Sequence, residues 1–242
     1  MLPAFVLAML AAAWAPAASA ASGLSLGWGD CRAAGGPGTD LLHFGCATTS
    51  NELPLFPGFV LAATVDSVIS MELVIDVDVA ADPLPDWWRT DAGQCRAGGW
   101  SADIEAPPSC VDAWNTLGVA SFQGWIAGTP GGSTHHGRLL VAAAAVPGTL
   151  AKLDPGVPYT ACRVLLRTNN TATCAGCDVP ACLMLNSLLI RRAPGSSVEE
   201  ILLSAPESPG LTFVHWQSDT GADCQSVPVR RTTWGAVKAL YR

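Results

Sequence analysis

The sequence predicts an all-β protein, a disulfide-stabilised β-sandwich or jelly roll with few short helices. Three observations favour this fold class: long stretches of alternating apolar and polar residues, frequent Gly- and Pro-rich turns, and nine cysteines among 242 residues. Half of the residues are hydrophobic and only 14% are charged, so the chain can bury a large core and is not disordered. The length suits one domain, or two small ones at most.

The clearest strand signal spans residues 68–79. Apolar side chains alternate there with a second face that includes Glu72, Asp76 and Asp78. This pattern predicts a strand with one buried and one solvated face. Further strands are expected at residues 58–65, 138–146, 159–168, 182–191, 199–204 and 212–217.

Few segments favour a helix. Residues 112–117 predict one short turn of helix, and residues 233–240 predict another at the C-terminus. The segment near 83–110 has few strand features, but it contains three tryptophans and two cysteines. We expect it to be a long disulfide-tied loop, and loops of that length are often functional.

Residues 1–20 have the pattern of a secretory signal peptide. An apolar run over residues 2–14 precedes Ala18-Ser19-Ala20, which predicts cleavage near Ala20 and a single mature domain over 21–242. The run of about 13 residues is short of the about 20 that a membrane span needs. We therefore expect a secreted, periplasmic or cell-surface protein with no membrane span in the mature chain.

Export makes disulfides the expected state of the cysteines, with eight paired and one left over. The candidates for pairing are Cys31, Cys46, Cys95, Cys110, Cys174, Cys177, Cys182 and Cys224. Short spacing predicts the bridges Cys31–Cys46 and Cys95–Cys110. Cys162 is the expected free thiol, because it shares the apolar face of a predicted strand.

The remaining cysteines lie in Cys174-x-x-Cys177-x4-Cys182. Disulfides are the preferred interpretation, with Cys174–Cys182 and Cys177–Cys224 as one pairing. A zinc site completed by a distant ligand and a redox CxxC are the alternatives.

Two motifs together are distinctive: Cys174-Ala-Gly-Cys-Asp-Val-Pro-Ala-Cys182 and the ending Thr233-Trp-Gly-Ala-Val-Lys-Ala-Leu-Tyr-Arg242. With the opening 24–31 and the segment 84–88, they resemble a group of uncharacterised exported bacterial proteins that have a CAGCxxPxC stretch and a C-terminal TWGxVKxLYR ending. The resemblance implies export and paired cysteines. It implies no activity and no catalytic residue.

Acidic residues are densest at the end of the strand predicted at 68–79. Asp76, Asp78 and Asp82 supply the oxygen ligands that calcium prefers, although no Asp-x-Asp-x-Asp-Gly loop is present. A solvated strand face is the competing interpretation. Asp76 and Asp78 are also candidates for the carboxylate pair of a glycoside hydrolase.

The predicted loop offers a second candidate site. Trp87, Trp88 and Trp100 carry flat rings that stack on sugars, and Asp86 lies beside them to accept hydroxyl protons. Packing of the same rings onto the sandwich is the alternative. His135-His136 is a further candidate for metal binding or base catalysis, but adjacent residues of a strand point to opposite faces, so both bind one ion only if they lie in a loop.

These features favour a secreted, non-catalytic binding or structural module without a required cofactor. The alternatives are a carbohydrate-binding module that uses the loop tryptophans and a secreted hydrolase that uses Asp76 and Asp78. A glycan or a cell-surface component is the expected partner class. Nucleic acid is not, because the formal net charge of -7 repels phosphate.

Overall fold

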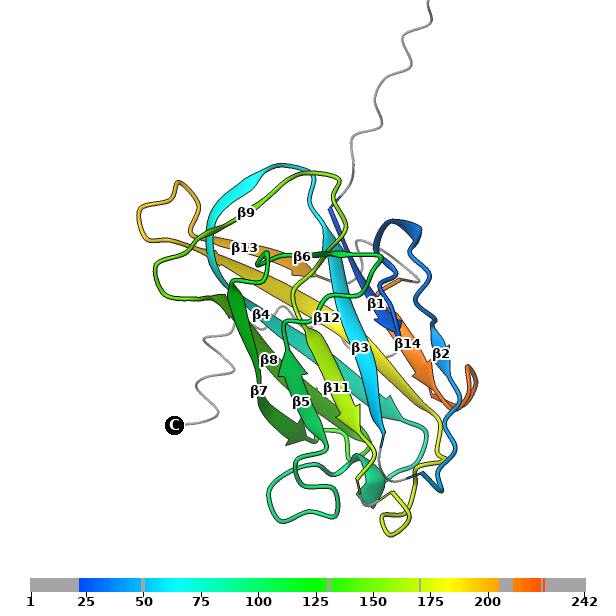
Figure 1. The fold of residues 1–242 in the computed structure, drawn as a ribbon. Coiled ribbons are helices and arrows are strands. Elements are labelled where there is room, and N and C mark those ends of the chain that lie inside the picture. The colour runs from blue at the N-terminus through cyan, green and yellow to red at the C-terminus, as the bar shows by residue number, and fades with distance from the viewer. Residues whose placement is uncertain are drawn as a thin grey trace, which may run out of the picture.

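Two β-sheets pack face to face around a shared core in this computed structural model (Figure 1). The structure describes residues 22–48, 51–129, 132–169, 171–204, 211–222 and 224. The only helical elements in those ranges are two short 3-10 turns, η1 (Ala33–Gly35) and η2 (Asp86–Trp88). The predicted all-β, disulfide-stabilised sandwich is therefore confirmed.

The smaller sheet has six strands and the larger has eight among the described residues. The smaller sheet contains β1 (Gly23–Trp28), β3 (Glu52–Val60), β5 (Trp100–Asp103), β6 (Val111–Asp112), β10 (Tyr159–Thr160) and β11 (Arg163–Arg167). The larger contains β2 (Leu41–Leu42), β4 (Val65–Val79), β7 (Gly118–Ala127), β8 (His136–Ala145), β9 (Ala151–Leu153), β12 (Ala181–Arg192), β13 (Glu200–Ser204) and β14 (Phe213–Trp216).

The strand predicted at 68–79 forms most of β4, the long central strand of the larger sheet. It pairs antiparallel with β12 on one side and β8 on the other. Leu73, Ile75 and Val77 are at most 1% exposed and lie in the core between the sheets. Their alternation with polar neighbours places Asp76 and Asp78 on the opposite face, as predicted.

Most of the other predicted strands are present with shifted ends. The segment 159–168 is divided into β10 and β11, and the strand expected at 58–65 is β3, which begins at Glu52. Pro54 and Pro57 lie inside β3. Because proline is unfavourable within most strands, they hid the first part of this strand from the sequence prediction.

The helix expected at residues 112–117 is absent from the described structure. The carboxylate of Asp112 accepts the backbone N–H groups of Trp114, at 2.9 Å, and Thr116, at 2.5 Å. Asn115 and Thr116 have φ angles of +49° and +66°. The segment therefore turns through the left-handed region instead of continuing a helix. The helix predicted at 233–240 and the signal peptide at 1–20 lie outside the described residues.

The cysteine prediction is correct in its members and wrong in its pairs. The eight candidates form four disulfides, Cys31–Cys110, Cys46–Cys177, Cys95–Cys174 and Cys182–Cys224. Spacing misled the local pairing because the sandwich brings together cysteines that are 42 to 131 residues apart. All three cysteines of the 174–182 cluster are in disulfides with partners outside it, which also overturns the zinc and CxxC alternatives there.

Cys162 is the free cysteine, and it is fully buried. Burial raises the pKa of its thiol to about 12, with a further contribution from the nearby charge of Asp103. The thiol is therefore protonated at neutral pH. Four disulfides fit a protein of an oxidising compartment. In the described part of the chain, no helix is long and apolar enough to cross a membrane.

Candidate metal centre

The loop tryptophans lie in the core. Trp87 and Trp88 are 0% exposed and Trp100 is 3% exposed. The ring of Trp87 stacks on that of Trp216 at 4.7 Å and meets the edge of Trp88 at 4.8 Å. These rings offer no face to a sugar, so the expected stacking surface is replaced by packing. Asp86, beside them, lies at the surface 3.4 Å from Arg89.

A buried arginine completes this packing. Arg96 is 0% exposed and lies over the Trp87 ring, 3.8 Å from its centroid. It donates to the carbonyl of Trp87 at 2.9 Å, to that of Asn169 at 3.2 Å and to that of Arg167. Burial lowers the pKa of Arg96 to about 10, so it remains a cation at neutral pH. We call Trp87, Trp88, Trp216 and Arg96 the tryptophan cluster; it fastens the 83–110 loop to the sandwich.

The face of β4 that was expected to be solvated is buried at its end. Asp76 is 0% exposed and Asp78 is 5% exposed. Arg138 binds Asp76 through two hydrogen bonds of 2.5 and 2.8 Å, and Asn186 donates to the same carboxylate at 2.6 Å. These donors come from β8 and β12, the strands on either side of β4.

Asp76 is therefore unavailable for the roles predicted from the sequence. Its two carboxylate oxygens already accept three hydrogen bonds from Arg138 and Asn186, and the side chain is buried. Asp76 and Asp82 are not part of the group of ligand atoms that converges among the described residues, and Arg138 and Asn186 already bind the carboxylate of Asp76. The sequence showed the carboxylates but not the arginine and amide that the neighbouring strands place against them.

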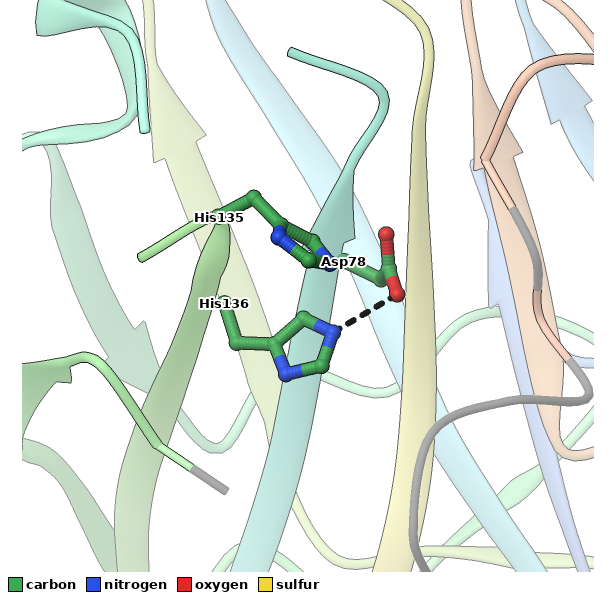
Figure 2. A group of neighbouring side chains, drawn as sticks. All are labelled: Asp78, His135 and His136. Carbon is green, nitrogen blue, oxygen red and sulfur yellow. Dashed lines mark hydrogen bonds and ion pairs between the residues drawn. The ribbon is translucent and has the colours of Figure 1, made fainter. Parts of the chain in front are cut away.

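Asp78 belongs to a different group, which includes both adjacent histidines (Figure 2). One nitrogen of His135, one of His136 and one carboxylate oxygen of Asp78 all lie within 4.8 Å of one another. The Nε2 atom of His136 is 2.8 Å from the Asp78 carboxylate, and the two imidazole rings are 4.3 Å apart. Asp78 and His136 are buried, whereas the His135 side chain is 33% exposed.

The two histidines reach one side because only one of them belongs to a strand. His136 is the first residue of β8 and pairs with Asp78 across the sheet. His135 precedes the strand, and its carbonyl accepts the N–H of Val79 at 3.2 Å. The rule that adjacent strand residues point to opposite faces therefore does not apply to this pair.

Side chains around His135 orient its ring. The hydroxyl of Ser133 lies 2.8 Å from Nδ1 of His135, and the Asp82 carboxylate lies 3.8 Å from the same nitrogen. Thr134 donates its hydroxyl to Asp82. The same hydroxyl is 3.4 Å from Nε2 of His135, so the shorter contact favours Nδ1. Such hydrogen bonds commonly set the tautomer and the ring orientation of a metal-binding histidine. Asp82 is close to His135 but is not one of the three residues whose ligand atoms converge.

The donor set selects a class of ion. Two imidazoles and one carboxylate suit zinc and related divalent transition metals, whereas calcium prefers oxygen ligands alone. Three protein ligands would leave one position of a tetrahedral ion for water or for an outside ligand.

Fold and site together define the class as a disulfide-stabilised β-sandwich protein with a histidine- and aspartate-lined polar site. Comparisons with protein-family models, with curated proteins and with solved structures find no match.

Proposed function

We propose that this protein is an exported, non-catalytic binding module that holds a divalent transition metal of the zinc class. The ligands are Asp78, His135 and His136. The observation that supports the proposal is the convergence of their three ligand atoms within 4.8 Å of one another. Four disulfides support the exported setting.

Metal binding would use the existing hydrogen bond between Asp78 and His136. An ion bound by both atoms, now 2.8 Å apart, would require the proton between them to leave Nε2 of His136, for Nδ1 of the same ring or for solvent. Bonds of about 2.0–2.1 Å place tetrahedral ligand atoms roughly 3.3 Å apart. The Asp78 oxygen and the His136 nitrogen, now 2.8 Å apart, would therefore separate slightly, and the His135 nitrogen would move toward them. Its position before the strand and its partial exposure allow that movement.

The fourth coordination position would be where the module binds its partner. Because His135 reaches the surface, an ion held there meets water or a ligand atom of an extracellular or cell-surface partner. The glycan alternative has less support, since the loop tryptophans are buried. The hydrolase alternative has less support as well, since Arg138 and Asn186 occupy Asp76.

Calorimetric titration of tag-free, EDTA-treated protein with zinc sulfate tests the proposal, with calcium chloride as the comparison ion. We expect one zinc per chain and little heat with calcium. His135→Ala and Asp78→Asn should each weaken zinc binding at least about 100-fold, more than the roughly 10–100-fold lost when a residue that only hydrogen-bonds to a ligand is changed. His43→Ala, which removes an exposed histidine away from the site, should leave it unchanged.

Two results would overturn the proposal. One is the absence of zinc binding by the unsubstituted, EDTA-treated protein. The other is equal zinc affinity in His135→Ala, Asp78→Asn and His43→Ala, which would assign the heat to scattered surface groups.

A further inference from the structure

The outer face of the larger sheet is buried at its centre. Val74 of β4 and Leu140 of β8 are cross-strand partners. Their neighbours Ile75 and Leu139 lie in the core between the sheets, so the two side chains point away from that core. Val74 and Leu140 are nevertheless only 8% and 2% exposed, and Met184 of β12, on the same face, is 6% exposed. A face of an antiparallel sheet that is turned away from the core is commonly solvated, so this burial needs a cause.

The described residues that pack against this group belong to the same sheet. Ile126 of β7 packs against the first two residues, and Phe213 of β14 packs against Met184. We use outer strip for these five residues: Val74, Ile126, Leu140, Met184 and Phe213. Side chains stand out from a sheet, so neighbours in the same sheet shield their flanks and not their outer ends. Burial of the outer strip therefore requires a segment that lies across it.

A carboxylate on the same face lacks a donor. Glu72 precedes Val74 by two residues in β4, so its side chain leaves the sheet on the same side. Oε1 of Glu72 accepts a hydrogen bond from Arg191 at 3.1 Å, whereas Oε2 is buried without a hydrogen-bond partner among the described residues. A buried charged oxygen without a donor is costly. The segment that covers this face should therefore bring a cation.

The disulfide between Cys182 and Cys224 brings the chain onto this face. Cys182 lies two residues before Met184 in β12 and stands on the same side of the sheet. Cys224 packs with Cys182 and Phe213. The chain therefore continues into residues 225–242 from one end of the outer strip.

Residues 225–242 have the composition that this face needs. The segment contains four cations and no Asp or Glu: Arg230, Arg231, Lys238 and Arg242. In the helix that the sequence predicts at 233–240, Trp234 and Val237 share one side, and Tyr241 continues it. The segment thus offers one apolar side for the outer strip and a choice of cations for the free carboxylate oxygen.

We propose that the outer strip is the docking surface for residues 225–242 of the same chain. The apolar side of that segment, with Trp234 at its centre, covers the strip, and one of its four cations binds Oε2 of Glu72. The distance to be covered, from the level of Cys182 to that of Glu72 along β4, is about 20 Å. Eight extended residues reach about 26 Å, so residues 225–232 are long enough to place the predicted helix on the strip.

Photo-crosslinking of the full chain, with EDTA present to keep the test independent of the metal centre, shows where the segment lies. Trp234 is replaced by p-benzoylphenylalanine, and an equal mixture of 15N-labelled and unlabelled chains is irradiated, reduced and digested for mass spectrometry. We expect cross-links within one chain to peptides that contain Val74, Leu140 or Met184. The same photoreactive residue at Val198, which is 53% exposed between β12 and β13, is the matched control and should not reach those peptides.

Trypsin cleavage of the unlabelled protein measures the same docking without a photoreactive group. Its sites in the segment follow Arg230, Arg231 and Lys238. Trp234→Ala should raise the rate of cleavage at these sites at least about tenfold, because a segment that has lost its apolar contact opens more often. Glu72→Gln should raise the rate by a smaller factor, and Val198→Ala should leave it unchanged.

Three results would count against the docking. Cross-links between labelled and unlabelled chains would assign the outer strip to a second copy of the protein. Cross-links that miss the strip, or none at all, would leave it to a separate partner. Equal cleavage rates in the parent protein and in Trp234→Ala would show that the segment is not held by its apolar side.

Discussion

The tryptophan cluster and the row of polar residues on β4 and β8 were both candidate binding regions, and both are buried. We use polar row for Asp76, Asp78, His136 and Arg138. In the tryptophan cluster, burial removes large apolar rings from water, and Trp87 also donates its indole N–H to Thr171 at 3.3 Å. In the polar row, burial is tolerated only where each charge has a partner.

The polar row itself contains two different situations. Arg138 and Asn186 donate three hydrogen bonds to Asp76, whereas within the described ranges the Asp78 carboxylate has one hydrogen-bond partner, His136, with His135 close by. Saturation makes Asp76 structural, and the nearby second imidazole makes Asp78 a metal ligand candidate. The role of a buried polar residue therefore depends on how many of its polar atoms already have partners in the fold.

The largest expected effect is in the tryptophan cluster. Trp87→Ala should lower the free energy of unfolding by about 3–5 kcal/mol, because it leaves a cavity beside Trp216 and Arg96. Urea unfolding measures the change, and zinc titration should show unaltered affinity in the folded protein. If the parent protein bound a glycan array and Trp87→Ala lost that binding with unchanged stability, the cluster would instead be a recognition surface.

The next effect is in the polar row. Asp76→Asn should cost about 3 kcal/mol, because it leaves the buried Arg138 guanidinium without a countercharge. Asp103→Asn breaks a more exposed pair with Arg163 and should cost no more than about 1 kcal/mol. Equal costs in urea unfolding would contradict the assignment of Asp76 to a structural role.

The smallest effect concerns Asp91, in the loop that the tryptophan cluster fastens. Partial burial raises the pKa of Asp91 above its usual 3.8, against smaller opposing contributions from its backbone hydrogen bond and Arg89. A raised pKa in the folded state gives stability that is present below pH 3.8 and is lost as the pH rises through the folded pKa. The free energy of unfolding of Asp91→Asn, compared with that of the parent protein at the same pH, should therefore be more favourable to the variant at neutral pH than at pH 3.

Thermal unfolding of both proteins at the two pH values measures this difference. Asp86→Asn, at an exposed carboxylate of the same loop, is the control. A pH-independent difference for Asp91→Asn would mean that the loop does not bury this carboxylate.

The fold was more predictable than the site. Alternation along β4 indicated both its length and its two faces, since burial of one face requires that period. The histidine pair was visible too. The sequence also shows two acidic residues in Asp76-x-Asp78 and two basic ones in His136-x-Arg138, with the same spacing. Their pairing needed the antiparallel register of β4 with β8, which no local pattern specifies.

The sequence by itself determined the strand periodicity, the eight paired cysteines and the buried Cys162, because these depend on residue type and local alternation. The tertiary structure alone decided which cysteines join, why three tryptophans pack instead of bind, and how Asp78 meets two histidines. Each of those outcomes depends on contacts between strands far apart in the chain, and therefore on the register and stacking of whole sheets.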